Sequence, residues 1–216
     1  MPRPCCVVHS NNKAHAQHAE LASCPPVLAF MAPRIHLMTY LVSDDNLKLQ
    51  HWLKHYIHNL GVWANQTRVI LRMRPSASLV AANATIAVAV AAGVLPENIR
   101  QQHSPPSDAV KIALMNEHIT SLDDEAWHIY ADVDELFDYP CELLDERPGF
   151  FTCVVGKMWD QLSATFELRE LKAEPDLTEQ FPLQCRIRDH FPQMMPDKAR
   201  ACHAHLCRSY RSCHSF

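Results

Sequence analysis

The chain has 216 residues, which is enough for one well-buried domain. Its 48% hydrophobic and 20% charged content is that of an ordinary globular protein. A net charge of −4, without a basic aromatic-rich patch, argues against nucleic-acid binding, and the four glycines are too few for a glycine-rich phosphate loop or a dinucleotide fingerprint.

The two ends of the chain carry no periodic pattern. Residues 1–33 contain five prolines, and we expect a poorly ordered leader that lacks the apolar core of a signal peptide. Residues 201–216 form a tail rich in Cys and His whose spacing matches no zinc module, so incidental Cys and His are favoured over a zinc site. No run reaches ~18 apolar residues, so we expect no transmembrane helix.

The periodic pattern begins at Ile35. The run IHLMTYLV is typical of a strand, and Ser43, Asp44 and Asp45 then supply side chains that cap helices. Apolar residues follow at helical spacing in one continuous stripe, which we expect to pack against a sheet with Trp52 buried. The stripe comprises Leu49, Trp52, Leu53, Tyr56, Ile57 and Leu60.

Strands and helices continue to alternate downstream. The sequence predicts strands over 68–73, 98–102 and 127–131, and helices over 78–92 and 107–122. Gly61 and Gly93 are expected to end the first two helices. The order β-α-β-α-β-α-β predicts an α/β fold: a mainly parallel sheet with helices on both faces. Such sheets bind ligands at the carboxyl ends of their strands.

Asp132 and Asp134 directly follow the fourth predicted strand, in WHIYADVDELFDYP (127–140). In an extended segment residues two apart face the same side, so the two carboxylates are expected to converge. Converging carboxylates suit a hard divalent cation such as Mg²⁺ or Mn²⁺. The alternative is a solvated turn in which Asp132 accepts N–H bonds and Asp138 caps the next helix. Because the acids end an apolar strand at the ligand-binding edge, we favour the metal site.

The segments HWLKHYIHNLGV (51–62), NEHI (116–119) and WHIYADVDELFDYP (127–140) occur in this order along the chain. Together they resemble the GT-A class of nucleotide-sugar glycosyltransferases, in particular its family-2-like and family-92-like branch. EQFPLQCRIRD (179–189) is similar to a further segment of that group. The resemblance spans about residues 35–200 and makes 34–200 the expected GT-A-like domain. Leu136 departs from the family, which usually has Phe there.

This resemblance implies transfer of a sugar from a nucleoside diphosphate sugar to an acceptor hydroxyl on a glycan, a lipid or a protein. It also implies that Asp132 and Asp134 bind Mn²⁺ or Mg²⁺ together with the donor diphosphate. It suggests the Golgi or secretory lumen; because no signal or anchor is evident, a cytoplasmic location is the alternative.

The carboxyl-end rule also indicates where the nucleotide would bind. Ser43 and Asp44 end the first strand, and Arg72 or Arg74 ends the second. Lys111, near the start of the third helix, is a candidate phosphate contact because it carries a point charge. Each has a structural alternative, as a helix cap or a solvated side chain. Asp132 is expected either to be a co-ligand of the metal or to contact the ribose.

An inverting transferase needs a base for the acceptor hydroxyl. Asp160, in KMWDQ after the strand-like FFTCVVG, is the first candidate and Asp189 the second. His51, His55 and His58 lie off the apolar stripe, and we expect surface histidines rather than metal ligands.

Two other functions remain open. A truncated or inactive GT-A-like domain would bind a nucleotide or a partner without turnover, since the chain ends at Phe216, where GT-A enzymes often continue through an acceptor-binding region. A D-x-D phosphatase would need the motif after the first strand, with Thr or Val in the place of Leu136, and it is disfavoured.

Overall fold

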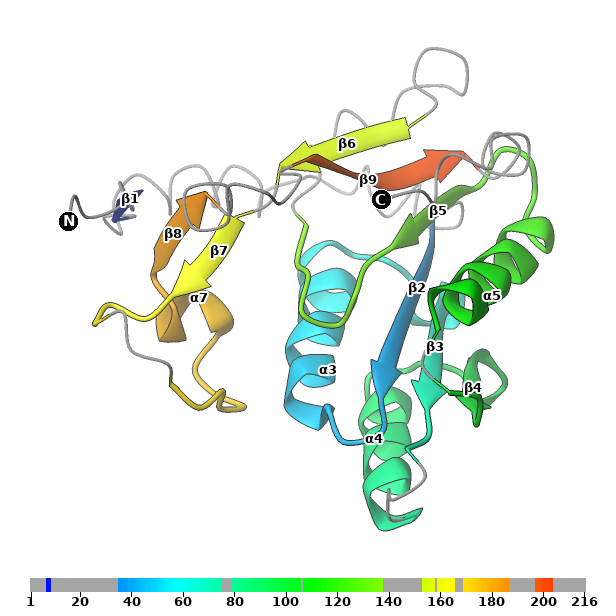
Figure 1. Cartoon of the computed structure of the whole chain (residues 1–216), viewed down its shortest axis with the longest axis horizontal. Helices are drawn as coiled ribbons and strands as arrows, with labels where there is room; N and C mark the ends of the chain where they lie inside the picture. The colour runs from blue at the N-terminus through cyan, green and yellow to red at the C-terminus, as the bar shows by residue number, and fades with distance from the viewer. Residues whose placement is uncertain are drawn as a thin grey trace.

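The structure is a computed structural model that describes residues 7–8, 35–74, 79–105, 107–137, 153–157, 159–165, 169–186 and 197–203. Within these ranges only the course of the backbone is described for residues 7–8, 153–160, 184–186 and 197–203. The strands form a six-stranded sheet, in the order β4-β3-β2-β5-β9-β6, and a separate three-stranded sheet, in the order β1-β8-β7 (Figure 1).

The first four strands of the large sheet are parallel to one another. They are β2 (Ile35–Val42), β3 (Thr67–Arg72), β4 (Ile99–Gln102) and β5 (Trp127–Tyr130). Helices connect them in turn: α3 (Asn46–Leu53) with a π-helical turn, η2 (Lys54–Asn59), then α4 (Leu79–Ala91) and α5 (Asp108–Thr120). Short 3₁₀ turns, η3 (Ala64–Gln66) and η4 (Pro96–Asn98), precede β3 and β4. The predicted alternation of strands and helices is therefore confirmed.

The remaining strands are antiparallel to their neighbours. In the large sheet they are β6 (Cys153–Lys157) and β9 (Asp197–His203), and β9 lies between β5 and β6. The small sheet consists of β1 (Val7–Val8), β7 (Trp159–Leu162) and β8 (Leu183–Arg186), with the short helix α7 (Leu177–Gln180) leading into β8. Residues 201–203 of the expected tail complete β9, and residues 7–8 of the expected leader pair with β8.

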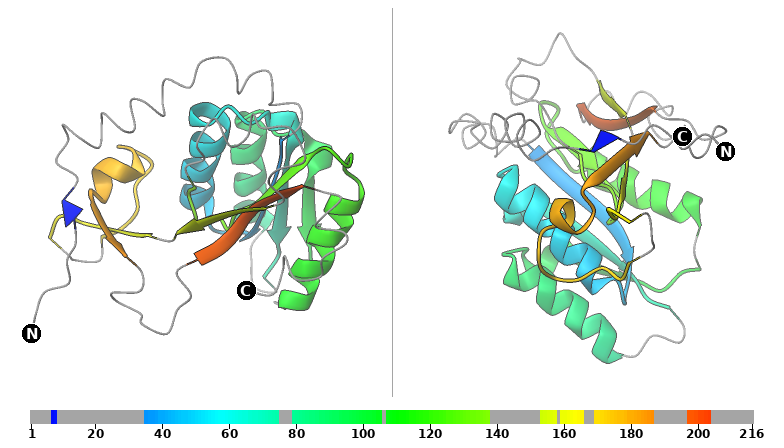
Figure 2. Two further views of the ribbon diagram at one scale, coloured as in Figure 1. Left: turned by 90° about the horizontal axis from the view of Figure 1, so that it is seen from above. Right: turned by 90° about the vertical axis from the view of Figure 1, so that its left-hand side faces the viewer.

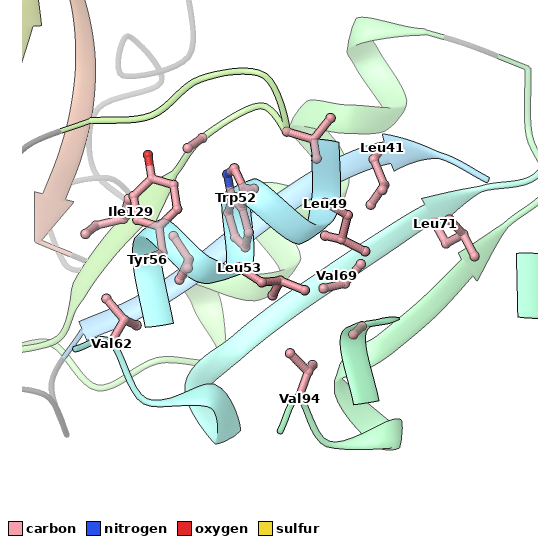
Figure 3. Close-up of a cluster of buried hydrophobic side chains, with 14 of the residues drawn as sticks. Leu41, Leu49, Trp52, Leu53, Tyr56, Val62, Val69, Leu71, Val94 and Ile129 are labelled. Carbon is pink, nitrogen blue, oxygen red and sulfur yellow. The ribbon is translucent and has the colours of Figure 1, made fainter. Parts of the chain in front are cut away.

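Helices cover both faces of the parallel strands, as Figures 1 and 2 show. On one face the buried side chains of α3 and α4 pack against alternate residues of β2, β3 and β5 (Figure 3). The predicted stripe is part of this core: Leu49, Trp52, Leu53 and Tyr56 are buried, and Ile57 and Leu60 pack against them. On the other face α5 packs through Leu114 and Met115 against Met38, Ile70 and Tyr130.

Glycine ends the first two helical connections, as predicted. Gly61 has φ +75° and Gly93 has φ +91°, in the left-handed region that glycine adopts without a steric cost. The helix starts differ from expectation. Asp45 is the N-cap of α3 and Ser107 that of α5, but neither side chain makes a capping hydrogen bond.

Candidate functional site

β5 lies beside β2 at the point where the strand order reverses, and its last residue, Tyr130, is in register with Met38 of β2. β2 pairs with β3 on one side and with β5 on the other, although β5 is the last of the four parallel strands along the chain. The Ala131 N–H donates to Met38 O at 3.2 Å and extends this pairing by one residue. In open α/β sheets ligands bind in the crevice at such a switch point. Both chain segments that leave it are acidic, at 43–45 and 132–135.

Asp132 is held from two sides. The Lys111 ammonium, from the first turns of α5, lies 2.6 Å from Asp132 Oδ1, and the Tyr130 hydroxyl donates to the same oxygen. Lys111 Nζ also lies 4.6 Å from the centre of the Tyr130 ring, a cation–π contact. Burial, and then the negative charge of Asp132, raises the pKa of Tyr130 far above its usual range, so this phenol stays a hydrogen-bond donor.

Asp134 faces a different cation. Its side chain is 65% exposed, and its carboxylate lies 4.0 Å from the Lys48 ammonium of α3, which in turn lies 3.4 Å from Asp45. Lys48 therefore connects the acidic segment after β2 with the one after β5. A lysine therefore lies beside each acid of the motif, and these two positive charges reduce the repulsion among the carboxylates at this strand end.

The expected convergence of Asp132 and Asp134 on a common point stays a prediction. The two carboxylates have different ammonium partners, contributed by helices on opposite faces of the sheet. Among the described residues no group of three or more His, Cys, Asp or Glu side chains is arranged to hold a metal ion. A metal at this edge would therefore need ligand atoms from a substrate or water in addition to these two acids.

The residues predicted to contact a nucleotide lie around the same edge. Ser43 is completely buried, and its hydroxyl has no hydrogen-bond partner among the described residues. Its backbone is fixed, because its N–H donates to Arg72 O at 3.1 Å and its carbonyl accepts from the Thr85 hydroxyl at 2.7 Å. Asp44 is half-exposed and pairs with Arg74 at 3.2 Å. Neither Ser43 nor Asp44 acts as the cap of α3, which was their structural alternative.

Arg72 is the last residue of β3 and lies beside Val42 in the sheet register. Its charge acts on Tyr40: burial raises the pKa of the Tyr40 phenol, and the guanidinium of Arg72 opposes that shift. Arg72 and Lys111 thus place two of the predicted cationic contacts on the face of the sheet that α5 covers.

The predicted catalytic bases are not brought to this edge by any described contact. Asp160 lies in β7, where its backbone pairs with Cys185 of the small sheet, and its side chain is outside the described part of the structure. Asp189 and the predicted cap Asp138 both lie outside the described residues. The choice of base stays a prediction.

Three residues at this edge were not assigned to the site from the sequence: Lys48, His55 and Tyr56. The Tyr56 hydroxyl donates to Glu135 O at 3.2 Å and accepts the Phe137 N–H at 3.0 Å, and His55 Nε2 lies 2.9 Å from Phe137 O. One signal was present, because a Tyr in a buried stripe needs a partner for its hydroxyl. The long-range partners of Lys48 and His55 left no signal in the sequence.

The expectation of three surface histidines on this helix is wrong for two of them. His51 is buried, with Nε2 2.7 Å from Lys172 O, and His55 is half-buried in the contact just described. Only His58 is exposed. The helix face beside the apolar stripe is covered by the segments around 137 and 172, which the helical pattern could not reveal.

Comparison with known proteins adds no assignment. Models of known protein families do not match the chain, and no curated protein matches it. In the described ranges no helix is both long and apolar enough to cross a membrane. The resemblance to GT-A glycosyltransferases therefore stays a prediction that rests on its motifs.

Proposed function

We propose that the chain is a GT-A-type glycosyltransferase domain. It would bind a nucleoside diphosphate sugar at the carboxyl ends of β2 and β5, with a divalent metal ion, and transfer the sugar to an acceptor hydroxyl on a glycan, a lipid or a protein. The observation that carries the proposal is the position of the acids: Asp132 and Asp134 follow the strand next to β2 at the switch point of the parallel sheet.

The residues at this edge fit a hard divalent cation that is shared with a diphosphate. Asp134 presents an exposed carboxylate that lies 4.0 Å from the Lys48 ammonium. Asp132 adds a second oxygen donor two residues earlier. Mg²⁺ is usually bound through one or two carboxylates, with substrate phosphates and water completing the shell. Two carboxylates at this edge therefore match a metal that arrives with its substrate. When bound, the ion would supply Lewis-acid stabilisation of the charge on the leaving diphosphate.

The chain's own residues have separate tasks in this proposal. Asp134 would bind the metal directly, and Asp132 would be a co-ligand or would contact the ribose. Lys111 holds a positive charge beside Asp132, where it would neutralise a phosphate oxygen. Ser43, with its buried hydroxyl unpaired among the described residues, offers a polar group to the nucleotide at the end of β2.

A test compares wild type with Asp134→Asn, which keeps the size of the side chain and removes its charge. Wild type should bind Mn²⁺ in calorimetry, and uridine or guanosine diphosphate should raise the melting temperature only when Mn²⁺ is present. At a ligand concentration a hundred times Kd the stabilisation is about 2.7 kcal/mol. Asp134→Asn should lose both effects, whereas Glu97→Gln, an exposed acid on η4, should keep them. A full nucleotide shift in chelator would contradict the metal site.

Nucleotide binding without turnover is the second candidate. It is favoured by one observation: lysines already lie at Asp132 and Asp134, so a diphosphate could be bound by ammonium groups at this edge. The two functions differ in product. A transferase releases nucleoside diphosphate from its sugar donor in the presence of an acceptor, whereas a binding domain gives the thermal shift without any release.

A further inference from the structure

The acidic turn after β5, residues 132–137, is hydrogen-bonded to η2, the π-helical turn that follows α3. Two consecutive residues of η2 make the attachment. Tyr56 uses its hydroxyl both as donor to Glu135 O, at 3.2 Å, and as acceptor from Phe137 N–H, at 3.0 Å. His55 Nε2 lies 2.9 Å from Phe137 O and therefore carries the proton in this contact. Three hydrogen bonds thus tie the backbone of 135–137 to two side chains.

The Tyr56 ring is a fixed point from which the turn is held. It is completely buried, and its centre lies 4.8 Å from that of Trp52 (Figure 3). The His55 ring packs against it edge-on, with the ring centres 4.8 Å apart. A ring enclosed in this way cannot change its rotamer without disturbing the core around α3. The position of its hydroxyl, and therefore of the turn, is set by core packing.

The π-helical turn explains why neighbours in the chain reach the same target. Residues 54–59 form i→i+5 hydrogen bonds, and the Leu60 N–H donates to His55 O at 2.9 Å. A π turn holds more residues than an α turn, so successive side chains diverge less around the axis. His55 and Tyr56 can therefore both face 135–137, and short π-helical segments of this kind occur frequently at functional sites.

The attachment reaches Asp132 through one more residue. The Glu135 N–H donates to Asp132 O at 2.9 Å, and the Glu135 carboxylate accepts the Asp132 N–H at 3.2 Å. Lys48, one helical segment earlier, contacts Asp134. A continuous set of hydrogen bonds therefore runs from the Tyr56 hydroxyl through Glu135 to the backbone of Asp132.

We propose that Tyr56 and His55 are positioning residues that fix the direction of the Asp132–Asp134 carboxylates, so that the turn is preorganised to bind a divalent cation and a diphosphate. This role rests on the proposed function of the edge. In this role neither side chain would bind the metal or the substrate itself. Each acts on the ligand residues through the backbone of the turn, as residues behind metal ligands commonly do.

The experiment uses changes that keep the core packed. Tyr56→Phe removes only the hydroxyl, His55→Ala removes the imidazole, and His55→Gln restores an N–H donor at similar reach. His58→Ala, an exposed residue of the same π turn, is the matched control. Mn²⁺ affinity is measured by calorimetry with and without uridine diphosphate, and amide hydrogen exchange is followed across 131–137.

Tyr56→Phe and His55→Ala should weaken Mn²⁺ binding by about ten- to a hundredfold, which is the usual effect of losing a residue that orients metal ligands. His55→Gln should recover most of the affinity, and His58→Ala should match wild type. Exchange across 131–137 should accelerate in Tyr56→Phe while other protected segments keep their rates. Wild-type affinity in both Tyr56→Phe and His55→Ala would overturn the proposal.

A failure of the proposed function would give a different set of results from a failure of the positioning role. If wild type binds neither Mn²⁺ nor nucleotide, the transferase assignment is wrong, and hydrogen exchange alone then decides the positioning role. Faster exchange confined to 131–137 would support a preorganised turn whose ligand is of another kind. Unchanged exchange in both variants would show that the three hydrogen bonds do not hold the turn.

Discussion

The Lys111 ammonium lies 2.6 Å from the Asp132 carboxylate, and this contact joins the start of α5 to the end of β5. Both side chains are about three-quarters buried, at 27% and 28% exposure. The contact sets the charge of the candidate site, because it places a fixed cation beside the first acid of the D-x-D motif.

Replacement of Lys111 by Met should change the affinities for metal and for nucleotide in opposite directions. Without the ammonium, Mn²⁺ meets less repulsion and should bind more tightly in the absence of nucleotide. Uridine diphosphate should bind about ten- to a hundredfold more weakly, because a charged hydrogen bond contributes roughly 1.5–3 kcal/mol. Calorimetry measures both affinities. Lys54→Met is the control, since Lys54 pairs with Asp176 and Glu174 instead. Equal affinities in Lys111→Met and wild type would mean that this charge does not act on the site.

Trp52 should be a main source of stability. Its side chain is completely buried in the core between α3 and the sheet, so Trp52→Ala should lower the free energy of unfolding by about 3–5 kcal/mol. Trp52→Phe should cost less, because the indole N–H that it removes is buried without a partner among the described residues. Chemical denaturation of both variants gives the two values. A Trp52→Ala protein as stable as wild type would show that the helix face is misassigned.

The two helix-ending glycines should differ in their response to alanine. Both have positive φ, so a Cβ costs about 1–2 kcal/mol at either position. At Gly61 the added Cβ would meet nothing within 4 Å, whereas at Gly93 it would lie 3.2 Å from the Ala64 Cβ. Gly93→Ala should therefore be the more destabilising of the two in thermal melts. The reverse order would indicate that Ala64 moves aside at no cost.

His118, in the last turn of α5, should make the protein sensitive to acid. Its ring is buried, packs edge-on against the rings of His36 and His128, and has no hydrogen-bond partner among the described residues. Burial, and then the charges of Arg68 and His36, lowers the pKa of His118 from 6.5 to about 3. Burial also lowers the pKa of His36, and the negative charge of Asp123 opposes that shift.

The sign of the effect follows from proton binding. Between about pH 6.5 and pH 3 the unfolded chain binds a proton at His118 that the folded protein does not. The free energy of unfolding therefore keeps its full contribution from His118 above pH 6.5 and falls as the pH decreases below that value. The slope from this residue is at most about 1.4 kcal/mol per pH unit. Denaturation curves at several pH values should show a smaller slope for His118→Phe than for wild type. Identical slopes would mean that His118 does not contribute, since the carboxylates titrate in both proteins.

Much of the fold could be predicted from the sequence because its signals are local. The spacing of Leu49, Trp52 and Tyr56 indicates a helix with one buried face, and the apolar run 127–131 ahead of Asp132 indicates a strand end. These patterns depend only on the periods of helix and strand. They correctly predicted the alternation of parallel strands with helices, and they identified the acids that follow β5.

The arrangement around those acids was decided by tertiary structure. Strand order, the insertion of β9 beside β5 and the contacts of Lys48, Lys111, His55 and Tyr56 all join segments far apart in the chain. A sequence period shows which face of an element is buried, but it does not show which segment covers that face. His51 and His55 were therefore predicted to be surface residues, although each contacts a backbone carbonyl far away in the sequence. The separate lysine partners of Asp132 and Asp134 have the same origin, because Lys111 and Lys48 come from helices that pack on opposite faces of the sheet.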